Sequence, residues 1–330
     1  MSSIREVAKL AGVSPATVSR VLNGTATVAP EKKQRVLEAV AQTAFVPNEL
    51  ARSLYKKSTK TIGLIIPSIR NPFFTQFASV IDEVAKEYGF RLFLCNVGDD
   101  LEEERAALVK MMASSVDGVI IASTNEEIQK DLENCRLPVI VVDALFETKN
   151  VNAYIYCDYY QGGWLAAQHL HKDCQCGNIV CIRGPHHIYT ARTRYEGYRD
   201  YCLEHGLVER TVDCDYDFLR GMEMTRELLE RYPDVDGILA CDDIVAISTY
   251  KVLSQKKIRV PEQVQLVGFD DIALSTLITP ELTTICQPIE EMARAAAQLL
   301  LDGKVPEKEG KQFVFPISLT IRETTRSEHK

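Results

Sequence analysis

The chain has 330 residues, which is enough for two or three domains, and its hydrophobic content of 46% is sufficient for a globular core. It has no apolar run of about 18 residues, and its N-terminus has no basic patch followed by an apolar stretch. These features argue against a membrane-spanning helix and a secretory signal, and we expect a cytoplasmic protein.

Charge is distributed unevenly along the chain. The first 60 residues carry a net charge of +6, whereas the remaining residues carry −14, which brings the total to −8. A small basic module on an acidic body indicates that only the N-terminal part of the protein meets a polyanion.

Two short helices are predicted before residue 24. Ser3 and Glu6 have the spacing of a capping box, and Gly12 suits the left-handed end of a helix. Ser14 and Pro15 then start a second helix. Apolar residues recur at helical spacing on one face of each helix, at Ile4, Val7, Ala8 and Ala11 and then at Val18, Val21 and Leu22. Two such helices joined by a tight turn predict a helix-turn-helix.

The outward face of the second helix has small residues near its start and one cation a turn later, at Pro15, Ala16, Thr17 and Arg20. Such a helix can enter a major groove, where arginine makes two hydrogen bonds to guanine. Asn23 at its end can bond a phosphate. A third helix is predicted at residues 30–43, with Leu37, Val40, Ala41 and Ala44 on one face. A helical hairpin used only for packing stays open as the alternative.

Residues 4–14 and 16–23 resemble the N-terminal signature of the lac repressor (LacI/GalR) family almost residue for residue. The resemblance implies that Pro15, Ala16, Thr17 and Arg20 read base edges. Ser14 and Asn23, at the two ends of the same helix, complete the DNA-contacting set that we expect in the headpiece.

Residues 47–54 resemble the hinge helix of the same family. The resemblance implies that this helix forms on DNA, that Ala51 and Leu54 make a small apolar face, and that Leu54 enters a minor-groove step and kinks the duplex. The alternative is a helical linker. We therefore expect a headpiece at residues 1–46, a hinge helix or linker at 47–59 and an effector-binding and dimerisation core at 60–330.

From residue 61 short apolar runs alternate with helical segments. Runs of strand length lie at residues 62–66, 91–95, 118–122, 138–142, 179–182, 237–240 and 264–267. Continuous runs of this kind predict a buried parallel sheet with helices on both faces. The pattern restarts near residue 160, which predicts two similar, doubly wound α/β lobes.

The resemblance implies that these lobes are of the periplasmic-binding-protein type. The N-lobe is then expected at residues 60–159 and 289–322, and the C-lobe at 160–288 and 323–330. Three crossovers near residues 159, 288 and 322 would join them.

Ligands of open parallel sheets bind beyond the carboxyl ends of the strands, and polar and aromatic residues follow the predicted strands here. Taken singly, an aspartate after a strand is often a helix cap, and Phe74 is typical of a core face. As a set, these residues resemble the pentose pocket of ribose-binding proteins and ribose repressors. The set comprises Asn71, Phe73, Phe74, Asp143, Arg194, Tyr216, Asp242, Asp270 and Gln287.

Two positions depart from that pattern. Ala144 stands where the family often has arginine, and Asp242 stands where it usually has asparagine. Losing a cation and gaining a carboxylate allows an unpaired negative pocket. Ribose is therefore in doubt as the ligand, and another pentose, a hexose or a disaccharide stays open.

Other chemistry has weaker support. His169, His171, Cys174 and Cys176 lie close together, but their spacing fits no recognised zinc motif, and a helix end with surface histidines is the favoured interpretation. The ten cysteines are expected to be reduced and mostly buried. No dinucleotide, P-loop or hydrolase motif is present, so neither a cofactor nor an enzyme is expected.

The sequence therefore predicts a DNA-binding transcription regulator, a repressor of a sugar-utilisation operon that leaves its operator when a small sugar binds between the lobes. Since operators in the family are near-palindromic, the working unit is expected to be a homodimer. Two alternatives stay open: a catabolite-control regulator that needs a phosphorylated partner protein, and a sugar-binding or sugar-cleaving protein without regulatory DNA binding.

Overall fold

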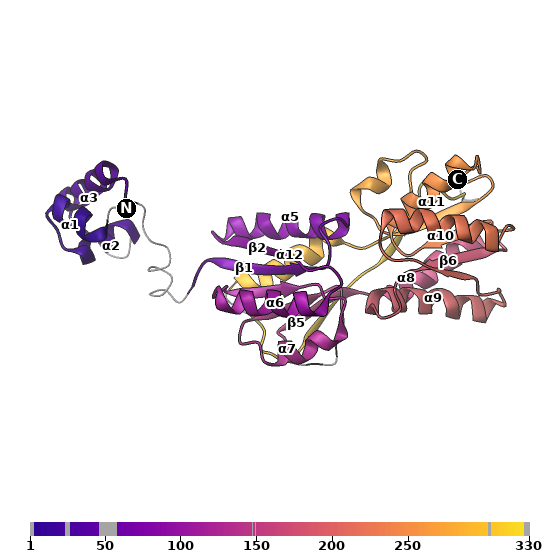
Figure 1. Ribbon diagram of the computed structural model, residues 1–330, viewed down its shortest axis with the longest axis horizontal. Coiled ribbons are helices and arrows are strands. Elements are labelled where there is room, and N and C mark those ends of the chain that lie inside the picture. Colours follow the sequence, from indigo (N-terminus) through magenta and orange to yellow (C-terminus); the bar gives the residue numbers. More distant parts are fainter. Residues whose placement is uncertain are drawn as a thin grey trace. The chain divides into compact units, whose positions relative to one another are not determined.

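The structure is a computed structural model that describes residues 3–23, 27–45, 58–146, 148, 150–302 and 305–326. The chain divides into two compact units, the headpiece (Met1–Thr59) and the core (Lys60–Lys330) (Figure 1). In the described part of the chain, no helix is long and apolar enough to cross a bilayer.

The headpiece contains α1 (Ile4–Ala11), α2 (Pro15–Asn23) and α3 (Pro30–Thr43). The capping box at the start of α1 is present, because Ser3 Oγ accepts from the Glu6 N–H and the Glu6 carboxylate accepts from the Ser3 N–H. Gly12 ends the helix at φ 62°, a left-handed conformation that glycine adopts without steric cost. The predicted helix-turn-helix is confirmed.

The buried face of α3 differs from the prediction. Val36 and Ala39 are buried against α1 and α2, whereas Leu37 is 45% exposed and Ala41 and Ala44 are also exposed. Two apolar stripes overlap on this helix and share Val40. Packing against Val7, Ala8, Ala11 and Val18 selects the stripe that contains Val36, and the periodicity of α3 alone does not distinguish the two.

The first sheet of the core forms the N-lobe, with strand order β11-β5-β4-β3-β1-β2 and only parallel pairs among its described strands. Successive residues of β1 face opposite sides, since Leu64 and Ile66 pack with α5 and α12 whereas Ile65 packs with α6. The strands are β1 (Thr61–Ile66), β2 (Arg91–Asn96), β3 (Gly118–Ile121), β4 (Val139–Val142), β5 (Ala153–Cys157) and β11 (Lys311–Phe315). The helices are α5 (Pro72–Glu87), α6 (Leu101–Ala113), η1 (Glu126–Ile128), α7 (Gln129–Glu133) and α12 (Ile289–Leu301).

The second sheet forms the C-lobe, with strand order β12-β10-β9-β8-β6-β7. Its described pairs are parallel except β12 with β10, which is antiparallel. The strands are β6 (Ile179–Arg183), β7 (Thr211–Asp213), β8 (Gly237–Ala240), β9 (Gln265–Asp270), β10 (Thr283–Cys286) and β12 (Ser318–Thr320). The helices are α8 (Tyr159–Gln168) with its π-helical extension η2 (His169–Asp173), α9 (Tyr189–His205), α10 (Phe218–Arg231), α11 (Asp243–Gln255) and η3 (Ala273–Thr276). The two doubly wound lobes are thus confirmed.

The chain crosses between the lobes after β5, before α12 and between β11 and β12. The third crossover was expected near residue 322. It lies instead at residues 316–317, because Phe315 still pairs in the N-lobe sheet whereas Ser318 pairs with Cys286 in the C-lobe sheet. β12 is a three-residue edge strand, and so short a strand has no apolar run by which its sequence reveals it.

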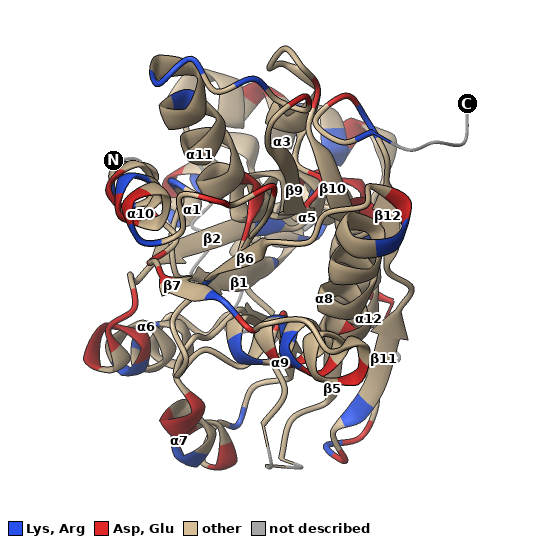
Figure 2. Ribbon diagram, turned by 90° about the vertical axis from the view of Figure 1, so that its right-hand side faces the viewer, with Lys and Arg blue, Asp and Glu red and all other residues tan. Residues whose placement is uncertain are grey.

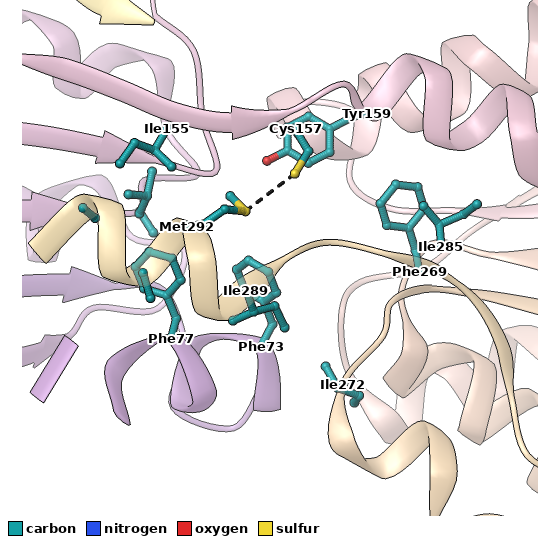
Figure 3. Packing of buried hydrophobic residues seen from close by; sticks show 14 of the residues in the cluster. Phe73, Phe77, Ile155, Cys157, Tyr159, Phe269, Ile272, Ile285, Ile289 and Met292 are labelled. Carbon is teal, nitrogen blue, oxygen red and sulfur yellow. Dashed lines mark hydrogen bonds between the residues drawn. The ribbon is translucent and has the colours of Figure 1, made fainter. Parts of the chain in front are cut away.

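One hydrophobic cluster continues from the N-lobe into the C-lobe at the crossovers (Figure 3). Phe73, Phe77 and Met292 contribute from the N-lobe, and Phe269 and Ile285 contribute from the C-lobe. Burial of a large apolar side chain contributes about 1.5–3 kcal/mol. The connection between the lobes is therefore a packed apolar contact as well as three chain crossings.

Acidic side chains of the core lie partly at helix N-termini. The first turn of α6 has Glu102, Glu103 and Glu104, and Figure 2 shows further acidic residues on α7. A carboxylate in the first turn of a helix is stabilised by the helix dipole and by unpaired N–H groups. Part of the negative charge of the core therefore has a local structural role.

Candidate functional sites

The outward face of α2 is the candidate DNA interface. Pro15, Ala16 and Arg20 are exposed, and Thr17 is half-buried. Ser14 precedes the helix, and its hydroxyl accepts from the Thr17 N–H and lies 2.9 Å from Thr17 Oγ1. On the opposite face, Val18 is fully buried and fixes the orientation of the helix. The side chain of Asn23 and the whole of Ala51 and Leu54 lie outside the described residues.

A cleft of about 490 Å³ lies between the lobes, within the 300–1,000 Å³ typical of small-molecule sites. Its walls come from the segments that follow β1, β2, β3 and β4 in the N-lobe and β6, β7 and β9 in the C-lobe. Seven of the nine predicted ligand residues line it, namely Asn71, Phe73, Phe74, Asp143, Arg194, Tyr216 and Asp270. The remaining two, Asp242 and Gln287, are buried and contact the lining residues.

Arg194 is the central cation of the cleft. It is 7% exposed, donates to the Cys241 carbonyl at 2.8 Å, and lies 3.1 Å from Asp270 Oδ1. Its guanidinium stacks 3.8 Å from the centre of the Phe269 ring. The Nε atom has no hydrogen-bond partner in the described chain.

Two glycines allow α9 to bring Arg194 to this position. A Cβ atom on Gly163 of α8 would lie 1.9 Å from the Arg194 carbonyl oxygen, and one on Gly197 would lie 2.1 Å from the Tyr160 carbonyl oxygen. Helices α8 and α9 therefore approach each other backbone to backbone, and only glycine fits at these two contacts.

Three carboxyl groups surround Arg194. Gln287 Nε2 donates to Asp270 at 2.7 Å, and Tyr159 donates to Asp143 at 2.5 Å. Asp242 begins α11 as its N-cap and accepts from the Val245 N–H at 2.7 Å.

Asn71 brings a helix N-terminus of the N-lobe against Asp242 of the C-lobe. Its Oδ1 atom accepts from the Phe73 N–H and caps α5, so its amide nitrogen points away from the helix. That nitrogen lies 3.5 Å from Asp242 Oδ2. Two helix caps, one from each lobe, thus meet across the cleft.

Aromatic rings supply the apolar part of the cleft wall. Phe73 and Phe74 are in edge-to-face contact at 5.1 Å, and Phe73 also packs into the hydrophobic cluster. Tyr216 comes from the loop before α10, and its buried hydroxyl has no partner in the described residues. The arrangement of a few polar groups and flat rings suits a small polar ligand.

Both parts of the chain match known protein families. Residues 3–48 match bacterial regulatory proteins of the lacI family, and residues 59–322 match the periplasmic binding proteins and sugar binding domain of the LacI family. The chain belongs to the LacI family. It is a DNA-binding transcription regulator and not an enzyme.

Relatives of this LacI-family regulator cover its full length. It is 37% identical to the ribose operon repressor of Halalkalibacterium halodurans over 99% of this chain and 98% of the relative. A LacI transcriptional regulator from Alkaliphilus metalliredigens, complexed with D-xylulofuranose, is 34% identical with a TM-score of 0.72, covering 81% of this chain and 100% of the other. The lac repressor dimer bound to operator shares the fold, with a TM-score of 0.87 and 24% identity over 99% of both chains.

Burial in the cleft of this LacI-family regulator also raises the pKa values of three aspartates. Burial raises the pKa of Asp143 to about 6, although Arg194 and Tyr159 oppose the rise. Burial and the neighbouring Asp270 raise the pKa of Asp242 to about 7. Burial also raises the pKa of Asp270 against the opposing effect of Arg194. Burial by itself lowers the pKa of Arg194, but the carboxyl of Asp270 raises it above its ordinary value.

Some lining residues were not predicted. Arg70, Asn96, Asp99, Thr124, Thr190, Asp215 and Asp217 also line the cleft. Most of them follow a strand, and the same signal that singled out Asp143 applies to Asn96, Thr124 and Asp215. By contrast, Asp243 serves the fold, because its carboxylate accepts from Ser275, Thr284 and the Ile272 N–H.

The histidine and cysteine cluster after α8 is structural in part. His169 was expected at the surface but is 1% exposed, because it packs under the C-terminal segment and bonds Thr325 at 3.0 Å and Asp173 at 2.9 Å. His171 is half-buried and bonds Tyr201. Within the described ranges no group of three or more His, Cys, Asp or Glu residues has metal-binding geometry. The ten thiols are free, and seven of them are buried.

Proposed function

We propose that this protein represses a sugar-utilisation operon and leaves its operator when a small sugar binds in the interlobe cleft. The observation that carries the proposal is a set of three buried polar atoms without partners in the described chain, Arg194 Nε, Tyr216 Oη and Gln287 Oε1. Leaving such groups unpaired costs about 1–3 kcal/mol each. Arg194 and Tyr216 line the cleft, where a ligand with several hydroxyls can pair with them, and Gln287 contacts the cleft through Asp270.

The chemistry of the cleft fits a polyol. Asp143 and Asp270 accept from sugar hydroxyls, Arg194 donates to a ring or hydroxyl oxygen, and the rings of Phe73 and Phe74 cover the apolar faces of a sugar ring. Asn71, Tyr216, Asp242 and Gln287 complete the proposed ligand set.

We propose a pentose such as D-ribose as the first candidate effector, since a ribose operon repressor and a D-xylulofuranose complex are among the similar proteins. The Ala144 side chain is 2% exposed and packs in the N-lobe core with Phe146. No cation therefore extends from that position into the cleft, and the cations that line it in the described chain are Arg70 and Arg194.

The DNA half of the proposal uses the headpiece. Pro15, Ala16, Thr17 and Arg20 contact base edges in the major groove, and Ser14 and Asn23 contact phosphates at the two ends of α2. Ala51 and Leu54 are proposed to make a small apolar face from which Leu54 enters the minor groove. Because one headpiece reads one half-site, we propose that the regulator works as a homodimer on a near-palindromic operator.

Sugar binding and DNA binding are coupled by a shift between two arrangements of the lobes. Sugar favours the closed cleft, in which the two headpieces of a dimer no longer fit the operator. A coupling free energy of about 1–3 kcal/mol is typical of such systems. This corresponds to roughly a 5- to 150-fold loss of operator affinity.

The test begins with thermal unfolding in D-ribose, D-xylulose, D-glucose and sucrose. A true effector stabilises the protein by about 2.7 kcal/mol at about 100 times its dissociation constant. An operator selected from random DNA by the purified protein is then used in gel shifts with and without that sugar. Stabilisation by a sugar together with release from DNA supports the proposal. If none of the sugars stabilises the protein or alters DNA binding, the sugar half of the proposal is wrong.

A further inference from the structure

The inner cleft has fewer cations than carboxyl groups. Asp143, Asp242 and Asp270 surround a single guanidinium, that of Arg194. Asp270 forms the ion pair with Arg194 and accepts from Gln287, and Asp143 accepts from Tyr159. Asp242 has no ion pair with Arg194, and among the described residues its polar partner across the cleft is the amide nitrogen of Asn71, at 3.5 Å.

Asp242 is also held away from water. Its side chain is 1% exposed, between the end of β8 and the first turn of α11. The charged and titratable groups that face it from neighbouring elements are Asp270 at the end of β9, Arg194 on α9, Cys214 after β7, Cys241 after β8 and Tyr216 before α10. Only Arg194 among these is positive, and it is engaged by Asp270. The amide groups at the start of α11 favour the charged carboxylate, but burial and Asp270 oppose it more strongly.

We propose that Asp242 takes up a proton when the cleft closes on a neutral sugar, so that the regulator binds its effector more tightly below neutral pH. This inference rests on the proposed function and concerns the regulation of the same site. The proton comes from solvent and adds to a carboxylate oxygen of Asp242, and no other bond changes. Closure brings this effect because it removes the water that stabilises the charge of Asp242. The Asn71 amide, which donates to Asp242 Oδ2 at 3.5 Å, favours the charged form but does not replace that water.

The direction follows from linkage. An open cleft gives water access to Asp242, and its pKa is then closer to the ordinary value for aspartate. In the structure, where Asn71 of the N-lobe lies 3.5 Å from Asp242, burial raises the pKa of Asp242 to about 7. Protonation of Asp242 therefore favours closure. Sugar affinity is greatest at low pH, and this gain in affinity is lost as the pH rises toward 7. Above that pH the affinity becomes level.

The first measurement is the dissociation constant of D-ribose, or of whichever sugar of the panel gives the largest thermal shift, between pH 6 and pH 8. We expect it to rise roughly twentyfold over this range, about tenfold from Asp242 and about twofold from Asp143. Calorimetric titrations at pH 7 in two buffers of different ionisation enthalpy should detect uptake of roughly half a proton per sugar.

Asp242→Asn is the decisive variant, because asparagine caps a helix as aspartate does but does not titrate. We expect its sugar affinity to vary by only about twofold over the same pH range, the remainder coming from Asp143, whose pKa is about 6. Asp82→Asn is the matched control, since Asp82 lies on the surface of α5 and pairs with Lys86. It should keep the full pH dependence.

The outcomes separate the two proposals. If a sugar binds with no proton uptake and a level affinity from pH 6 to 8, the role of Asp242 is wrong while the proposed function stands. Equal pH dependence in the wild type and Asp242→Asn also contradicts it. If no sugar binds at any pH, both proposals fail.

Discussion

The exposed face of α2 and the interlobe cleft differ in how their residues are arranged along the chain and in how deeply they are buried. The residues of the α2 face lie within seven consecutive positions, 14–20, and most of them are exposed. The residues of the cleft come from segments spread over about 200 positions. Arg194, Asp242, Asp270 and Gln287 are all buried, and Asp270 bonds both Arg194 and Gln287. One site is a surface carried by a single helix, and the other is a network that exists only when both lobes are folded.

This difference predicts how each site responds to mutation. A side chain on the α2 face touches little of its own protein, so its removal should weaken DNA binding and leave the core intact. A side chain in the cleft supports its neighbours, so its removal should affect both the ligand and stability. This distinction is wrong if variants of the α2 face alter sugar binding, or if variants of the cleft alter the DNA contacts of the headpiece.

The largest effect is expected from Arg194→Met. Removing one partner of a buried ion pair destabilises by about 3–5 kcal/mol, because the remaining charge is buried and unpaired. In this variant Asp270 loses its ion-pair partner. Asp143 and Asp242 lose the positive charge of Arg194, which favours their charged forms. We expect sugar affinity to fall at least roughly 100-fold, as measured by calorimetry at a temperature where circular dichroism shows the variant folded.

Arg210→Met is the control for that variant. Arg210 also forms an ion pair, with Asp234 at 2.7 Å, but this pair is at the surface and away from the cleft. Surface pairs contribute about 0–1 kcal/mol, so sugar affinity should stay within experimental error. If the two variants behave alike, Arg194 is not the central cation of a ligand site.

Arg20→Ala should have the next largest effect, on the other function. A bidentate contact to a base contributes about 1–3 kcal/mol of discrimination, which corresponds to roughly a 5- to 150-fold loss of operator affinity relative to random DNA. Sugar binding should be unchanged, because Arg20 lies in the headpiece. Lys33→Ala, at an exposed position of α3, is the control and should leave the ratio of operator to random-DNA affinity unaltered.

Gly163→Ala tests whether the cleft depends on the close approach of α8 and α9. The new Cβ atom would lie 1.9 Å from the Arg194 carbonyl oxygen, so one helix must move. Overpacking of this kind costs about 1–3 kcal/mol, and the shift should also weaken sugar binding because it displaces Arg194. Denaturant unfolding and calorimetry measure the two effects. Gly177→Ala, whose added Cβ would have its nearest neighbour at 3.9 Å, should change neither.

The same contrast explains what the sequence could predict. The headpiece motif is contiguous, and hydrophobic periodicity, caps and turns are local, so α1, α2 and most strands of the core were predicted correctly. Which face of a weakly amphipathic helix is buried depends on the helices that pack against it. For this reason Leu37 of α3 was predicted to be buried instead of Val36. The edge strand β12 lacks an apolar run, so the third crossover was misplaced. The contact of Asn71 with Asp242 depends on two lobes at once, and no spacing in the sequence reveals it.

The smallest effect is expected from the ion pair at the rim of the cleft. Arg192 on α9 of the C-lobe donates to Glu126 of η1 in the N-lobe at 2.8 Å, with side-chain exposures of 28% and 50%. Such a pair forms only when the lobes are close, but solvent screens it, so its coupling energy should be about 0.2–1 kcal/mol. Glu126→Gln, Arg192→Gln and the double variant define a cycle in sugar affinity, in which each single change weakens binding at most a few-fold and the double change weakens it by less than the sum. Additive effects would show that the rim pair does not help to hold the cleft closed, and the buried network around Arg194 would then carry closure without it.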